Sequence, residues 1–213
     1  MTPEESSIQA AEVCELAPVV PVLVVDDAQT AAPLAAALIS GGLPALEVTL
    51  RTPAALDAIR EMASVDGGVV GAGTLLTPAD VIAAKEAGAL FGVTPGTTDR
   101  LLDAALDAEL PLLPGAATAS EALKLLERGF SVQKFFPAEA SGGVPALKAI
   151  GAPIPQVRFC PTGGVSLKNA PEYLALSNTI CVGGSWVAPK DAVQSGNWER
   201  IEELAREAAA LTG

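Results

Sequence analysis

The segment PVVPVLVVDDAQTAAPLAAALISGGLPALEVTL (18–50) contains one complete unit of alternating structure. Residues 18–25 and 43–50 are apolar runs of strand length. Between them lies an alanine- and leucine-rich stretch of helical character that extends through Leu38. A strand, a helix and a second buried strand in this order predict two parallel strands joined by a helical crossover.

The same alternation continues to the end of the chain. Six further apolar segments are predicted to be strands, at 68–73, 89–94, 110–115, 131–137, 156–164 and 179–185. A helical stretch follows each predicted strand, and another helix covers about residues 4–16. Eight such units predict an α/β fold, namely a single (β/α)8 TIM barrel domain over residues 1–213 with an extra N-terminal helix. The alternative is an open, doubly wound sheet, which would usually have a glycine fingerprint after the first strand, where this chain has DDAQTAAP (26–33).

The composition excludes several classes of function. The 213 residues carry a net charge of −12 and offer no basic stripe for nucleic-acid phosphates. The sequence has no histidine, which removes Ser-His-Asp and Cys-His mechanisms and the usual zinc sites. Cys14, Cys160 and Cys181 have no disulfide or zinc spacing, and we expect the last two to be buried, inert thiols. With neither a signal peptide nor an apolar run of membrane length, we expect a cytoplasmic protein without nucleic-acid or membrane partners.

The second predicted strand carries charged residues that a hydrophobic core would not choose. By strand alternation, Glu47 and Arg51 face the barrel interior, whereas Leu46 and Val48 face the covering helices. A buried carboxylate and guanidinium are costly unless they are paired or used. They are either a structural ion pair or part of an active site, where buried ionisable groups are common.

Lys134 occupies a position unlike that of the other lysines, which are predicted on helices or loops. It shares a strand face with Val132 and Phe136. If that face is the barrel interior, desolvation disfavours the charged ammonium and frees a nucleophilic lone pair, as a Schiff-base lysine requires. The alternative is a lysine that extends its amine to solvent at the strand end.

Glycine-rich loops accompany the ends of the last two predicted strands, at TGGVS (162–166) and GGS (183–185). Loops after the seventh and eighth strands form the common phosphate site of such barrels, where backbone N–H groups hold the anion. Two plain tight turns are the alternative. Thr74 and Thr94, on neighbouring loops, could each donate a hydrogen bond to a substrate.

These segments resemble a known family, the 2-keto-3-deoxy-6-phosphogluconate (KDPG) aldolases, which also act on 4-hydroxy-2-oxoglutarate. The resemblance runs from about residue 18 to residue 205. Its most specific motifs are KFFPAE (134–139) and RFCPTGG (158–164). The other shared motifs are VTLRT (48–52), GAGT (71–74), TPG (94–96), PG (114–115) and GGSW (183–186).

The resemblance implies roles for individual residues. Lys134 is implied as the Schiff-base lysine and Glu47 as the proton shuttle. The carboxylate end of the keto acid is implied to lie at Arg51 and Thr74, near Pro95 and Phe136. The residues implied to bind the substrate phosphate are Gly163, Gly164, Gly184 and Ser185.

The resemblance also bears on specificity and assembly. Thr162 lies where the family distinguishes the gluconate epimer from the galactonate epimer, and threonine there favours gluconate. The family is usually a homotrimer. It needs no metal or other cofactor, because the substrate is activated as a covalent Schiff base.

Residues and resemblance together predict a class I aldolase. It would cleave 2-dehydro-3-deoxy-6-phosphogluconate to pyruvate and glyceraldehyde 3-phosphate, and also 4-hydroxy-2-oxoglutarate to pyruvate and glyoxylate. The alternatives are a phosphosugar isomerase or decarboxylase, which needs no lysine adduct, and a non-catalytic barrel that binds a phosphorylated metabolite. Fold alone does not separate them. Glu47 and Lys134 facing one interior favours catalysis.

Overall fold

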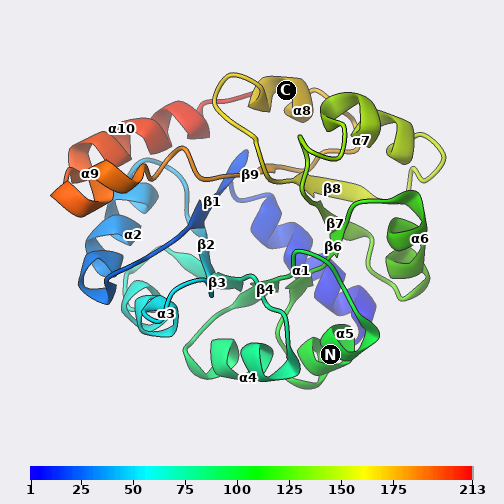
Figure 1. The fold of residues 1–213 in the computed structure, drawn as a ribbon, viewed down its shortest axis with the longest axis horizontal. Helices are drawn as coiled ribbons and strands as arrows, with labels where there is room; N and C mark the ends of the chain where they lie inside the picture. Colours follow the sequence, from blue (N-terminus) through cyan, green and yellow to red (C-terminus); the bar gives the residue numbers. More distant parts are fainter. Residues whose placement is uncertain (213) are drawn as a thin grey trace.

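The computed structural model describes residues 1–212, and Gly213, the last residue of the predicted domain, lies outside them. Strands lie at the centre of the molecule and helices surround them (Figure 1). The strands are β1 (Val19–Leu23), β2 (Ala45–Thr49), β3 (Val69–Gly73), β4 (Phe91–Val93), β5 (Leu112–Leu113), β6 (Gly115–Ala116), β7 (Val132–Phe135), β8 (Arg158–Pro161) and β9 (Val182–Gly184). The helices are α1 (Pro3–Cys14), the 3-10 helix η1 (Ala28–Thr30), α2 (Ala31–Ser40), α3 (Ala55–Ala63), α4 (Pro78–Glu86), α5 (Asp99–Asp107), α6 (Ala119–Glu127), α7 (Gly143–Gly151), α8 (Ala170–Leu174), α9 (Lys190–Ser195) and α10 (Trp198–Ala209).

Local sequence signals explain where several helices begin. Thr77, Thr98 and Thr118 lie in extended backbone, and each side chain accepts a hydrogen bond from the backbone N–H three residues later. This satisfies one of the N–H groups that a helix leaves unpaired at its start. None of the helices in the described part of the chain is long and apolar enough to cross a membrane.

The strands form two parallel sheets. One sheet has the order β5-β4-β3-β2-β1-β9, and the other has the order β6-β7-β8. In the first sheet Glu47 is in register with Val22 on β1 and Gly71 on β3. In the second, Lys134 is in register with Gly115 on β6 and Cys160 on β8. The two sheets therefore each contribute one of the predicted catalytic residues.

The predicted closed (β/α)8 barrel is wrong, although each of the eight predicted strand segments contains a strand. The structure has a half-barrel of six parallel strands and a separate sheet of three. The predicted strand at 110–115 is divided at Pro114, which has no N–H to continue the ladder. On the other side, β8 ends at Pro161 and forms no ladder with β9 in residues 1–212, where the two chain segments are joined only by the isolated bridges Phe159–Thr179 and Thr162–Gly183. Since the helices lie outside the strands (Figure 1), the doubly wound alternative does not form either.

Helix α1 connects the two sheets where the ladder is interrupted. Buried Ser6 accepts a hydrogen bond from the backbone N–H of Leu112 at 3.0 Å, at the edge of the six-stranded sheet. Buried Ser7 accepts two, from Ser131 at 3.0 Å and from Val132 at 3.1 Å, at the start of β7. Hydroxyl groups on one helix thus satisfy backbone donors of both sheets.

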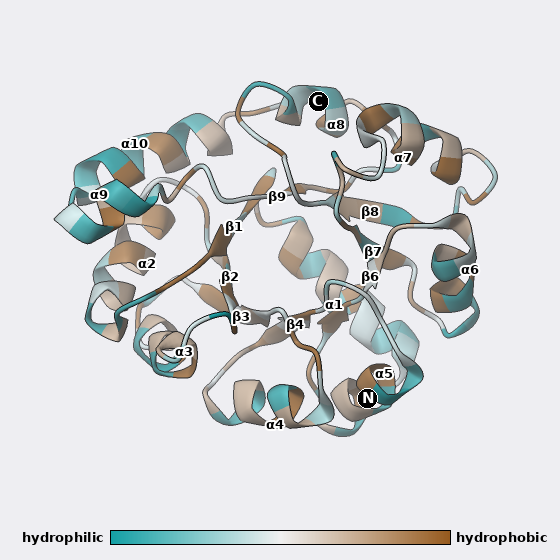
Figure 2. Ribbon diagram, in the orientation of Figure 1, coloured by the Kyte–Doolittle hydropathy of each residue, from teal (hydrophilic) through white to brown (hydrophobic). Residues whose placement is uncertain are grey.

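Side-chain alternation along the strands separates two cores. Leu46 and Val48 belong to the outer core between strands and helices, whereas Ala45 and Val132 belong to an inner core enclosed by the strands. The outward direction predicted for Leu46 and Val48 is therefore confirmed. Figure 2 shows apolar colours on most of the strands and hydrophilic colours on parts of the outer helices.

We predict that Ser7→Ala lowers the free energy of unfolding by about 1–3 kcal/mol, because two backbone donors at the start of β7 lose their acceptor. Urea unfolding measures the change. Ser64→Ala is the matched control, since the exposed Ser64 hydroxyl donates only to the Glu61 carbonyl at the end of α3, and the loss should stay within about 0.5 kcal/mol. Equal effects of the two substitutions would show that α1 does not hold the sheets together in this way.

Candidate active site

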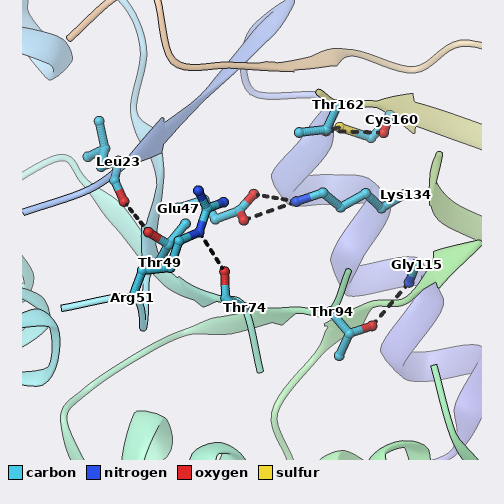
Figure 3. Close-up of polar contacts among 10 residues, drawn as sticks. All are labelled: Leu23, Glu47, Thr49, Arg51, Thr74, Thr94, Gly115, Lys134, Cys160 and Thr162. Carbon is cyan, nitrogen blue, oxygen red and sulfur yellow. Dashed lines mark hydrogen bonds and ion pairs between the residues drawn. The ribbon is translucent and has the colours of Figure 1, made fainter. Parts of the chain in front are cut away.

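The centre of the site is a buried ion pair between Lys134 and Glu47. Lys134 Nζ lies 3.1 Å from Glu47 Oε1 and 3.3 Å from Oε2, and donates to both. The two residues are only 4% and 3% exposed. Figure 3 shows the side chains extending toward each other, Glu47 from β2 and Lys134 from β7. Lys134 therefore lies in the interior, and the alternative, in which its amine extends to solvent, is excluded.

A glycine on the neighbouring strand makes room for the carboxylate. Gly73 ends β3 in register with Thr49, two residues after Glu47. A Cβ atom on Gly73 would lie 2.1 Å from Glu47 Oε1 and 2.7 Å from its Cδ. Such distances are far inside van der Waals contact, so any side chain at residue 73 would displace the carboxylate. The last glycine of the GAGT motif is therefore required by packing against Glu47.

Arg51 is at the rim of the site and not in the interior. Its side chain is exposed, and Nε donates a hydrogen bond to Thr74 Oγ1 at 3.3 Å. A structural Glu47–Arg51 pair is not formed, because Glu47 pairs with Lys134 instead. Thr74 has φ of +61°, which is strained for a β-branched residue. Such strain is typical of functional sites that hold a side chain in a required position.

An open cavity of about 360 Å³ lies beside the ion pair. Its volume falls in the range of small-molecule sites. The lining residues are Val22, Val24, Arg51, Thr74, Pro95, Phe136, Thr162, Gly163, Gly164, Val165, Gly183 and Ser185. The centre of the Phe136 ring is 5.5 Å from Lys134 Nζ, so the amine lies behind a residue of the cavity wall, and neither Lys134 nor Glu47 lines the cavity itself.

The structure brings most of the predicted site residues together. Around the cavity it places Arg51, Thr74, Pro95, Phe136, Thr162, Gly163, Gly164 and Ser185. Gly184 does not line the cavity, because alternation turns it toward the Trp186 ring, where a Cβ atom would lie 1.8 Å from Cζ3. Its neighbour Gly183 lines the cavity in its place. The sequence also gave no sign that Val22 and Val24 form one wall, since they look like ordinary strand residues.

Thr94 has a structural contact where the sequence suggested a substrate contact. Its buried hydroxyl accepts a hydrogen bond from the backbone N–H of Gly115 at 3.1 Å (Figure 3). The same hydroxyl oxygen lies 3.1 Å from Thr97 Oγ1. Thr97 Oγ1 donates in turn to the Gly115 carbonyl at 3.0 Å. The two threonines thus replace backbone pairing on the C-terminal side of Pro114, and they hold the loop that carries Pro95.

The three cysteines, far apart in sequence, gather in the inner core. Cys14, at the end of α1, packs with Cys160 and Cys181, and all three are buried, as predicted for the last two. Hydrogen bonds to Cys14 and Cys160, together with burial, raise the pKa of the Cys181 thiol. Sequence spacing could not reveal this cluster, because it depends on α1 crossing the end of the strands.

These observations define a class of protein. A buried amine beside a carboxylate, close to an open cavity in an α/β fold, can form and hydrolyse a covalent adduct with a carbonyl compound. The family model for KDPG and KHG aldolase matches residues 10–204. The chain belongs to the KDPG and KHG aldolase family, and it is an aldolase, an enzyme that cleaves carbon–carbon bonds.

Individual relatives agree with the family. The KHG/KDPG aldolase of Escherichia coli K12 is 53% identical over 192 residues, which cover 90% of each chain. The structure of the KDPG aldolase of Zymomonas mobilis ZM4 with 3-phosphoglycerate has a TM-score of 0.92 and 47% identity, over 97% of each chain. The KDPG aldolase of Legionella pneumophila, with pyruvate captured as a covalent carbinolamine, has a TM-score of 0.91 and 46% identity, over 94% of this chain and 98% of that one.

We predict that Gly73→Ala lowers aldolase turnover by about 10²–10⁴, the range for loss of a positioned acid–base group, because the new methyl group displaces the Glu47 carboxylate. Steady-state kinetics measures the loss, and circular dichroism checks the fold. Gly96→Ala is the control, since a Cβ atom there meets nothing within 4 Å. Turnover of Gly73→Ala close to that of Gly96→Ala would contradict the requirement for space beside Glu47.

Proposed function

We propose that this chain cleaves 2-dehydro-3-deoxy-6-phosphogluconate to pyruvate and glyceraldehyde 3-phosphate through a Schiff base on Lys134. We propose that 4-hydroxy-2-oxoglutarate is a second substrate, cleaved to pyruvate and glyoxylate. The observation that carries the proposal is the buried contact of 3.1 Å between Lys134 Nζ and Glu47 Oε1. The names of the relatives and the captured pyruvate carbinolamine of the Legionella enzyme support it.

Lys134 provides the covalent step. Its neutral amine attacks the C2 ketone, and the carbinolamine loses water to leave an iminium between Nζ and C2. The C3–C4 bond then breaks, and its electron pair moves into the iminium to form an enamine. Protonation at C3 and hydrolysis release pyruvate and return the amine. The iminium is the electron sink, so these steps call for neither a metal nor another cofactor.

Glu47 manages the protons of this cycle. From 3.1 Å it can accept a proton from the Lys134 ammonium and so release the nucleophile. It gives that proton to the carbinolamine hydroxyl, which leaves as water, and is a carboxylate again. During cleavage the carboxylate then takes the C4 hydroxyl proton as the aldehyde leaves. The same proton then serves for the enamine carbon. With no histidine in the chain, a carboxylate is well suited to this role.

Arg51 and Thr74 bind the carboxylate of the keto acid at the rim of the cavity. The Arg51 guanidinium is a planar donor that suits a carboxylate, and its hydrogen bond to Thr74 fixes its direction. Pro95 and Phe136 form the apolar part of this wall. Fixing this end places C2 over the Lys134 amine, which lowers the entropic part of the barrier.

The other end of the substrate lies at the glycine-rich loops. Gly163 and Gly164 have φ values of +99° and +80°, a backbone that residues with a side chain rarely adopt. These glycines and Ser185 line the cavity and bind the phosphate through backbone and hydroxyl donors, while Gly184 supports the strand behind them. The 3-phosphoglycerate complex of the Zymomonas enzyme supports a phosphate site in this family.

Thr162 determines which C4 epimer is cleaved. It is nearly buried between the amine and the phosphate loop, and a Cβ atom on Gly183 would lie 2.2 Å from its hydroxyl oxygen. The side chain therefore has little freedom to move away from the substrate. A fixed hydroxyl at this place favours the gluconate configuration.

The alternatives explain less of the site. A phosphosugar isomerase or decarboxylase would use the glycine loops but would have no use for a buried lysine that contacts a carboxylate. A non-catalytic binding protein would have no reason to bear the desolvation of both charged groups. The homotrimeric assembly and the cytoplasmic location stay predictions from the sequence and the family resemblance.

The test is the kinetics of two variants with both substrates, followed as pyruvate release. We expect Lys134→Gln to abolish cleavage, because its amide can still donate to Glu47 but cannot form an iminium. We expect Glu47→Gln to lower the rate by about 10²–10⁴. Wild-type-like cleavage by Lys134→Gln would exclude the Schiff base, and a loss of less than about threefold in Glu47→Gln would remove Glu47 from the chemistry.

A further inference from the structure

Tyr173, the only tyrosine of the chain, is fully buried on α8, and its hydroxyl donates a short hydrogen bond to Glu139 Oε1. Glu139 closes the KFFPAE motif but takes no part in the chemistry above. Burial, reinforced by the Glu139 carboxylate, raises the pKa of Tyr173 above its usual value. The hydroxyl therefore stays protonated and remains a donor to Glu139.

Glu139 lies directly behind the glycine loop of the cavity. A Cβ atom on Gly164 would lie 2.6 Å from Glu139 Cγ and 2.7 Å from its Cβ, so the loop and the side chain touch without a gap. The backbone is joined as well, because the N–H groups of Ala138 and Glu139 donate to the carbonyls of Thr162 and Gly163 at 2.8 and 3.0 Å. The loop is thus paired with the segment that follows β7.

Helix α8 holds the same loop from a second side. Asn169, the residue before the helix, donates through Nδ2 to the Gly164 carbonyl at 3.2 Å. Tyr173 follows four residues later, so both side chains lie on the same face of this short helix. The glycine loop is therefore held through Asn169 directly and through Glu139 indirectly.

This arrangement is unexpected on electrostatic grounds. A carboxylate close to a phosphate site repels the substrate, and a neutral side chain would avoid that cost. An exposed carboxylate could also turn away into solvent, whereas the Tyr173 hydroxyl holds Glu139 against Gly164. The hydrogen bond from Tyr173 to Glu139 is explained if the position of the Glu139 side chain against Gly164 matters more for the loop than its charge does.

We propose that Tyr173 and Glu139 are positioning residues that hold the Gly163–Gly164 loop in the conformation that receives the substrate phosphate. This inference deepens the proposed function and rests on its phosphate site. It implies that α8, which contributes no residue to the cavity lining, sets the affinity for phosphorylated substrates. The unphosphorylated substrate does not need this support.

The experiment compares three variants in two measurements. Tyr173→Phe keeps the buried ring and removes only the donor, Glu139→Ala removes the supporting side chain, and Glu139→Gln keeps a hydrogen-bond acceptor of the same shape. Binding of inorganic phosphate is measured by calorimetry, and KM and kcat are measured for the phosphorylated and unphosphorylated substrates. Glu172→Gln is the matched control, because it removes an exposed acid from the same helix.

We expect Tyr173→Phe and Glu139→Ala to weaken phosphate binding and raise KM for the phosphorylated substrate by about tenfold, the scale of one hydrogen bond to a charged group. The kcat of both variants for the phosphorylated substrate should stay within about twofold of wild type. Their KM and kcat for the unphosphorylated substrate should stay within the same limit. Glu139→Gln and the Glu172→Gln control should stay within about threefold throughout, because the acceptor for Tyr173 is kept.

Two results would overturn the proposal. One is phosphate affinity of a folded Tyr173→Phe variant within about twofold of wild type, and the other is an equal loss for both substrates, which indicates general destabilisation. Thermal unfolding without ligand checks that each variant is folded. Since phosphate binding needs no turnover, this test remains interpretable even if wild-type protein cleaves neither substrate, a result that would count against the proposed function alone.

Discussion

The buried contact between Lys134 and Glu47 is the interaction on which the rest of the site depends. Two charged groups removed from water are costly, and loss of one partner of such a pair typically costs about 3–5 kcal/mol, because it leaves the other charge uncompensated. The pair is therefore weak evidence that it stabilises the fold and strong evidence that it has a functional role. Its geometry also suits the proposed chemistry, because the amine proposed to form the iminium is within hydrogen-bond distance of the carboxylate proposed to move its protons.

The pair joins two sheets that the backbone does not hydrogen-bond into one ladder. Glu47 belongs to the six-stranded sheet and Lys134 to the three-stranded sheet. Their distance depends on contacts that cross the interruptions, namely the serines of α1, the Thr94 hydroxyl and the isolated bridges Phe159–Thr179 and Thr162–Gly183. Elements far from the cavity thus contribute to its geometry, and the glycine at residue 73 leaves the space in which the carboxylate lies.

The sequence was sufficient for features that follow from local pattern. Period-2 alternation correctly predicted that Glu47 faces the interior while Leu46 and Val48 face the helices, but it left open which way the face of Lys134 points, and it wrongly placed the exposed Arg51 in the interior. It could not show that the ladder is broken, because Pro114 within an apolar run looks like an ordinary strand end. Nor could it show the partner of Glu47, since Arg51 is near in sequence and Lys134 is near only in space. Three other features also depend on tertiary contacts. They are the position of Gly183 in the cavity wall, the hydrogen bonds that Ser6 and Ser7 accept from the two sheets, and the packing of the three cysteines together.

The central claim is that Lys134 is the residue that bonds covalently to the keto acid. The measurement that tests it most directly is reduction with borohydride in the presence of pyruvate, followed by mass mapping of the modified peptide. The account predicts one pyruvyl group, located on Lys134, with the other lysines unmodified. No adduct under conditions where pyruvate binds, or an adduct on another lysine, would contradict it.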